Sequence, residues 1–143
     1  MPLPTNRLIH ETRFWVRYAE TDRMGIVHHA TYIIYFEEAR NQFSRDMGAS
    51  YADFEKEGIA LVVSEANLRY LAPAIFGQEV VTKTWIDDMK SRRITFGYQV
   101  ENPENGEVHC TGNVKLICVT PNGQVQRIPR QWLETWGRAL ETK

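Results

Sequence analysis

The sequence has few cysteines. Its only two, Cys110 and Cys118, lie eight residues apart in one stretch that alternates like a strand. In an extended strand their Cα atoms would be about 26 Å apart, which excludes a disulfide between them. They also make a poor zinc site, because no second pair of ligands lies nearby. We therefore expect two buried thiols with a structural role.

Long apolar runs and an excess of charge are absent as well. No stretch of about 18 apolar residues occurs, so we expect no membrane span, and the N-terminal residues lack the apolar core of a secretory signal. These absences predict a cytoplasmic protein. Seventeen basic and eighteen acidic residues give a net charge of −1, so the overall charge offers no argument for binding nucleic acid or an anionic membrane.

The apolar residues that are present form two kinds of pattern. Three- and four-residue steps predict one long helix over 30–47, ending at Gly48, and shorter helices over 51–58 and 128–140. Alternating patterns predict five strands. These strands cover residues 13–18, 60–73, 79–87, 92–100 and 108–119.

This order of elements predicts an α+β domain over residues 1–143, with an antiparallel sheet curled around the long helix and a short C-terminal helix. Because the connections between the last four strands are short, we expect those strands to pair in sequence order. Trp15 and Trp85 are expected on the outer face of the sheet. They favour a homo-oligomer that buries this face, although large aromatic residues can also cap the edge of a core.

The stretch "YAETDRMGIVHHATY", residues 18–32, leads into the long helix. Asp22 precedes His29 by seven residues, and Gly25 permits a tight turn between them. If Thr31 lies inside the helix, the first N–H groups carry the positive end of the helix dipole without a standard cap. A carboxylate beside such a helix end suits attack on an acyl carbon. The alternative is that Asp22 caps its own turn and His28 and His29 are polar residues at the helix entry.

Two further charged groups have competing interpretations. Glu37 and Arg40 have the spacing of a helical ion pair, which we favour over a catalytic role for Glu37. The turn "DDMKSRR" gathers Lys90, Arg92 and Arg93, which suits phosphate groups. A solvated turn would explain this cluster equally well.

"YAETDRMGIVHHATYIIYFEEAR", residues 18–40, resembles the signature of the 4-hydroxybenzoyl-CoA thioesterase family of hotdog-fold acyl-CoA thioesterases. In that signature a Tyr, an Asp four positions later, a Gly, a His seven positions after the Asp and a Glu-x-x-Arg occur in this order. Weaker similarity covers most of the remaining chain, including "RYLAPAIFGQEV" and "KSRRITFGYQV". At His28 many members of the family carry Tyr instead, which leaves the shape of the acyl pocket open.

The resemblance implies hydrolysis of an acyl-CoA, or of the same thioester on acyl carrier protein, without cofactor or metal. It implies that Asp22 is the nucleophile or general base and that the N–H of His29 polarises the carbonyl, with the His29 side chain and Tyr18 lining the site. Substrate would also contact Gly25 and Val27, and Lys90, Ser91, Arg92 and Arg93 would lie near the CoA phosphates. The usual assembly of the family is a homodimer with sites at the subunit interface, often doubled to a homotetramer.

Two other functions remain open from the sequence. A hotdog-fold hydratase or dehydratase would need a His and an acid placed for proton abstraction, and Glu37 is the helix acid that could serve. The second alternative is a non-catalytic acyl-CoA binding module. Neither the length nor the aromatic or aliphatic nature of the acyl group follows from the sequence.

Overall fold

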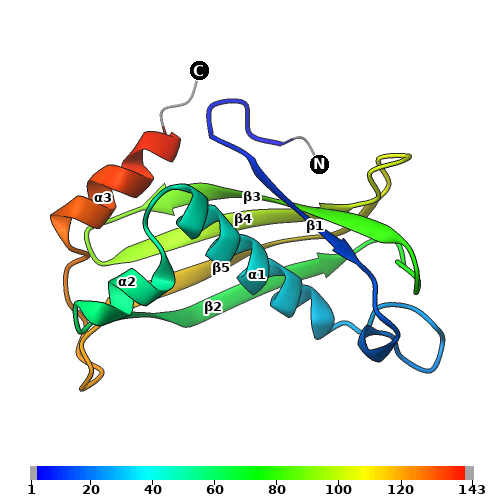
Figure 1. Ribbon diagram of the computed structural model, residues 1–143, viewed down its shortest axis with the longest axis horizontal. Helices are drawn as coiled ribbons and strands as arrows, with labels where there is room; N and C mark the ends of the chain where they lie inside the picture. Colours follow the sequence, from blue (N-terminus) through cyan, green and yellow to red (C-terminus); the bar gives the residue numbers. More distant parts are fainter. Residues whose placement is uncertain (1–2, 141–143) are drawn as a thin grey trace.

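The computed structural model describes residues 3–140. Its five-stranded antiparallel sheet has the order β1-β3-β4-β5-β2, and one long helix, α1, lies across one face (Figure 1). This is the α+β arrangement that the sequence predicted. The strands are β1 (His10–Trp15), β2 (Ala60–Tyr70), β3 (Glu79–Met89), β4 (Arg93–Glu101) and β5 (Val108–Val119), and the α-helices are α1 (Thr31–Asp46), α2 (Tyr51–Lys56) and α3 (Arg130–Gly137).

The strand order corrects one prediction. β3, β4 and β5 pair in sequence order, but β2 pairs with β5 and not with β3. The edge of β3 that β2 would occupy is taken by β1, which pairs with it from His10↔Thr84 to Trp15↔Glu79. The segment 71–78 therefore has to cross from one edge of the sheet toward the other (Figure 1). This crossing segment covers the end of the sheet where α1 begins.

The core forms between α1 and the inner face of the sheet. Phe36 stacks on Tyr98 with ring centroids 4.2 Å apart, and Phe43 meets Phe96 edge to face at 5.9 Å. Gly48 follows α1 with a φ of 80°, so the predicted helix end is confirmed. Ile33 of α1, although apolar, is 44% exposed. α1 lies over the β1 and β3 side of the sheet, so the side of the helix that carries Ile33 stays open.

β1 begins and ends three residues earlier than predicted. Its partner strand stops pairing at Glu79, and beyond it the Val16 backbone forms hydrogen bonds with the turn at Gln78 and Gly77. Residues Tyr18–Glu20 then form a 3-10 turn. As a result Tyr18 lies outside the strand, where its side chain is 78% exposed and packs edge to face on Phe76.

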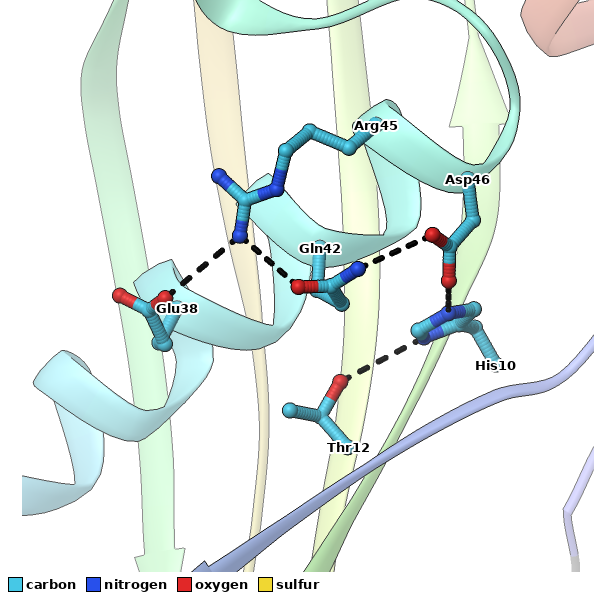
Figure 2. A network of polar contacts seen from close by, with 6 residues as sticks. All are labelled: His10, Thr12, Glu38, Gln42, Arg45 and Asp46. Carbon is cyan, nitrogen blue, oxygen red and sulfur yellow. Dashed lines mark hydrogen bonds and ion pairs between the residues drawn. The ribbon is translucent and has the colours of Figure 1, made fainter.

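A polar network joins β1 to the C-terminal turns of α1 (Figure 2). His10 Nε2 lies 2.6 Å from Asp46 Oδ2, and the other carboxylate oxygen of Asp46 accepts a hydrogen bond from Gln42. Arg45 extends the network to Gln42 and Glu38. The His10 ring also packs against Phe43. His10 therefore holds the first strand against the helix through both a polar and an apolar contact.

The outer face of the sheet carries the predicted tryptophan Trp85, which lies over Gly97 of the neighbouring strand. A Cβ at Gly97 would come 2.4 Å from the indole, so only glycine allows the ring to lie there. Both cysteines are buried and free, as predicted. Among residues 3–140, no helix is both long and apolar enough to span a membrane.

Candidate active site

Asp22 lies at the base of a small hairpin formed by residues 21–27. Thr21 and Val27 form a bridge, Asp22 N–H donates to Ile26 O at 2.8 Å, and Gly25 turns the chain with a φ of 78°. Oδ1 of Asp22 accepts the Met24 N–H at 2.8 Å. Asp22 therefore caps its own turn, which was the alternative interpretation of this residue in the sequence analysis. The second oxygen of its carboxylate accepts no hydrogen bond from residues 3–140.

The start of α1 has no side-chain cap. The N-cap is Ala30, and Thr31 is the first helical residue. The Thr31 hydroxyl is directed away from the helix N–H groups and donates to Glu20 O at 3.3 Å. Thr31 N–H and Ala30 N–H bond to His28, whereas within the described part of the chain the His29 N–H has no hydrogen-bond acceptor. A free donor thus stands at the positive end of the helix dipole.

Asp22 and this helix start share a cavity of about 320 Å³. One wall comes from the hairpin and α1, and the other from the end of β2, the segment 71–73 and β5. The side chains that define its chemistry are Asp22, Val27, His29, Tyr32, Tyr70 and His109. The cavity therefore combines a carboxylate, an electropositive helix end and aromatic walls, which is a combination that can hold an acyl group and act on its carbonyl carbon.

Three residues of the cavity were not singled out in the sequence. The Tyr70 hydroxyl donates to His29 O at 3.1 Å, so it ties the end of β2 to the helix start. Tyr32 is buried, and burial raises the pKa of Tyr32 to about 12. His109 donates from Nδ1 to Ala72 O at 2.9 Å, while its Nε2 is buried without a partner among residues 3–140. No sequence signal pointed to them, because the crossing segment that gathers them depends on the strand order.

Two residues that the family resemblance placed at the site, Tyr18 and Gly25, are not part of the cavity wall. Glu37, the acid that a dehydratase would need, has a side chain that is 65% exposed and approaches Arg40 at 4.0 Å. The favoured interpretation of Glu37 as an ion-pair partner is thus confirmed. Arg40 itself is buried and donates to the Tyr98 hydroxyl at 3.1 Å.

The cationic cluster lies at the opposite end of the sheet. Arg93 pairs with Ile117 on β5, whereas Tyr70 at the cavity pairs with Cys110. These two points on β5 are about 23 Å apart. The backbone of Ile128 bonds to Ser91 O at 2.8 Å. This contact brings two further basic residues, Arg127 before α3 and Arg130 at its start, to the same end of the molecule as Lys90, Arg92 and Arg93.

Other nucleophiles and metal ligands are poorly placed for chemistry. Burial raises the pKa of the Cys110 thiol to about 12, so this thiol stays protonated at neutral pH. Within residues 3–140, no three side chains of His, Cys, Asp or Glu come together to hold a metal ion. Asp22 is thus the ionisable carboxylate in the cavity wall.

Comparison with known proteins identifies the family and agrees with the fold. The family model described as "Thioesterase-like superfamily" matches residues 16–136. The YneP protein of Bacillus subtilis, provisionally named an acyl-CoA thioesterase, is 40% identical over 73% of this chain and 75% of its own length. The acyl-CoA thioester hydrolase YbgC of Escherichia coli is 31% identical over 74% of this chain and 78% of its own.

A solved structure has the same overall fold. The DHNA-CoA thioesterase of Staphylococcus aureus superposes with a TM-score of 0.86 at 34% identity, covering 91% of this chain and 89% of that one. The curled sheet around α1 is thus the hotdog fold of these enzymes. By the family model and these relatives, this chain belongs to the thioesterase-like superfamily.

Proposed function

We propose that this protein hydrolyses an acyl-CoA to a free acid and CoA. One observation carries the proposal. The Asp22 carboxylate and the uncapped start of α1 at His29 line the same cavity. Membership of a thioesterase superfamily and the activities named for YbgC and for the S. aureus enzyme support the same reaction.

The chemistry requires only these two groups. The His29 N–H donates to the thioester carbonyl oxygen and stabilises the negative charge that develops on it. Asp22, as general base, takes a proton from water while the hydroxide attacks the carbonyl carbon. The C–S bond then breaks, and the proton passes to the departing CoA sulfur. As a nucleophile, Asp22 would instead form a mixed anhydride and release CoA first, and water would then cleave the anhydride.

We assign the CoA phosphates to the cluster of Lys90, Ser91, Arg92 and Arg93. Lys90 approaches Asp88 at 3.6 Å, but Arg92 and Arg93 are exposed and make no ion pair with residues 3–140. In CoA the pantetheine arm separates the thioester from the phosphates, so the two parts of the site are expected to lie well apart. Arg127, at the same end of the molecule, adds to the positive charge.

We also propose that the protein forms a homodimer through β2. This strand is at the edge of the sheet, and it carries exposed Val62 and Val63. Ile33 and Ile34 of α1 are exposed as well. An open edge next to exposed apolar side chains favours pairing with a second chain. Sedimentation should give at least a dimer, and a strict monomer would contradict this assembly.

The decisive experiment follows thiol release from short, long and aromatic acyl-CoAs with a thiol reagent. Hydrolysis predicts equal amounts of free CoA and acid from at least one acyl group. The series includes hydroxylated aromatic acyl groups, because the similar S. aureus enzyme is named a DHNA-CoA thioesterase. A hydratase or dehydratase would change the acyl group without releasing thiol, and a binding module would bind acyl-CoA without turnover. Either result would overturn the proposal.

We place the reaction in the cytoplasm.

A further inference from the structure

Glu20 lies next to the candidate site without being part of its cavity wall. Its side chain is only 10% exposed. One carboxylate oxygen accepts the Arg17 N–H and the Tyr35 hydroxyl, each at 2.8 Å. The other accepts the Arg17 guanidinium at 2.8 Å and 3.1 Å. The carboxylate thus connects the 3-10 turn that precedes the hairpin to the second turn of α1.

The main chain of Glu20 makes a second set of contacts with the start of the helix. Its carbonyl oxygen accepts the His28 N–H at 2.8 Å and the Thr31 hydroxyl at 3.3 Å. The hairpin that carries Asp22 therefore leaves from Glu20 and returns to it. Asp22 is two residues beyond this point on one side, and His29 directly follows His28 on the other.

We propose that Glu20 is the positioning residue of the candidate site: its carboxylate fixes the hairpin so that Asp22 faces the start of α1. This inference rests on the proposed function, because it assigns to Glu20 a role in placing the catalytic carboxylate. Glu20 does not touch substrate and exchanges no proton with it. It acts through the geometry of Asp22 relative to the His29 N–H.

The charge state of Glu20 suits this role. Burial opposes its ionisation, but the hydrogen bonds from Arg17 and Tyr35 outweigh burial and hold the pKa of Glu20 below its usual value. A carboxylate with a lowered pKa is ionised throughout the neutral range, so its contacts persist there. In turn, burial and the contact with Glu20 raise the pKa of Tyr35, which keeps the tyrosine a donor. The contact is thus permanent under working conditions and does not act as a switch.

The test compares steady-state kinetics of Glu20→Gln and Tyr35→Phe with the wild type. Glutamine keeps the size of the side chain but removes its charge, and phenylalanine keeps the ring that stacks on Phe14 at 5.0 Å. Because small displacements of a reacting group are costly, we expect kcat of Glu20→Gln to fall about 10- to 100-fold. KM should change less than about threefold, since the binding surface remains. Tyr35→Phe should show a smaller loss of the same kind.

Three readouts separate positioning from a general effect on folding. The shape of the pH–rate profile between pH 6 and 8 should stay that of the wild type, because Glu20 does not titrate there. In an Asp22→Asn background, adding Glu20→Gln should lower the residual rate less than about threefold, because the group to be positioned is already lost. The matched control Glu79→Gln breaks the ion pair with Arg13, at 3.2 Å, and should leave kcat unchanged.

The outcomes are distinct. An active wild type with near-normal kcat in both Glu20→Gln and Tyr35→Phe would overturn this inference and leave the proposed function standing. The inference would also be overturned if Glu20→Gln lowered kcat by the same factor in the Asp22→Asn background as in the wild type. A wild type that releases thiol from no acyl-CoA would overturn both. If Glu20→Gln does not fold, Tyr35→Phe decides.

Discussion

Replacing Asp22 by asparagine should separate catalysis from folding in this protein. The hydrogen bond that Asp22 makes within its turn goes from Met24 N–H to Oδ1 at 2.8 Å, and an asparagine carbonyl oxygen can accept it equally. The free energy of unfolding should therefore change by less than about 0.5 kcal/mol. Loss of a general base typically lowers the rate about 10²- to 10⁴-fold. That loss corresponds to about 2.7 to 5.4 kcal/mol of activation free energy.

The assay is thiol release from a preferred acyl-CoA, with urea denaturation of the same samples to follow stability. Glu37→Gln is the matched control, because this acid lies outside the cavity with an exposed side chain. It should keep wild-type turnover within about twofold, as exposed surface changes usually do. Turnover of Asp22→Asn within threefold of the wild type would remove Asp22 from the mechanism. A larger loss in Glu37→Gln than in Asp22→Asn would reverse their roles.

Two further predictions concern the phosphates and acid stability. The double variant Arg92→Ala and Arg93→Ala should raise KM for acyl-CoA about 10-fold or more. It should leave KM unchanged for the matching acyl-pantetheine, which lacks the nucleotide. Equal effects on both substrates would refute the assignment of the phosphates to this cluster. The hydrogen bond with His10 is the main cause that lowers the pKa of Asp46. The stability that this hydrogen bond contributes is therefore present above the unfolded pKa of about 3.9. It is lost as pH falls through the lowered pKa of the folded protein. Asp46→Asn should reduce the loss of unfolding free energy below about pH 4, measured by urea denaturation, by less than about 1 kcal/mol, because Asp46 is exposed. An unchanged pH dependence would show that the network in Figure 2 contributes none of it.

Local features of the fold could be predicted from the sequence because they depend on neighbours along the chain. The three- and four-residue steps located α1 to within a residue at each end, and Gly48 ended the helix with the expected positive φ. Whether Thr31 caps this helix stayed open in the sequence, and the structure places Thr31 inside the helix with no capping side chain at Ala30. The ion pair of Glu37 with Arg40 was predicted, because it depends only on the three-residue spacing along the helix.

The order of the strands could not be predicted by the same argument. Short connections favour neighbours in sequence, yet β1 competes with β2 for the edge of β3 and pairs with it. Competition of this kind depends on the whole set of long-range contacts, which no local pattern contains. The same contacts end β1 early and leave Tyr18 exposed outside the cavity.

The candidate site likewise has one part that depends on neighbours along the chain and another that depends on long-range contacts. The sequence by itself predicted that Asp22 and His29 lie near each other, because only seven residues and a glycine turn separate them along the chain. Only the tertiary structure decided what faces them. The segment 71–73 brings Tyr70 and His109 to the cavity because the chain must cross from β2 to β3, and the cationic cluster lies at the far end of β5 because that is where β4 begins.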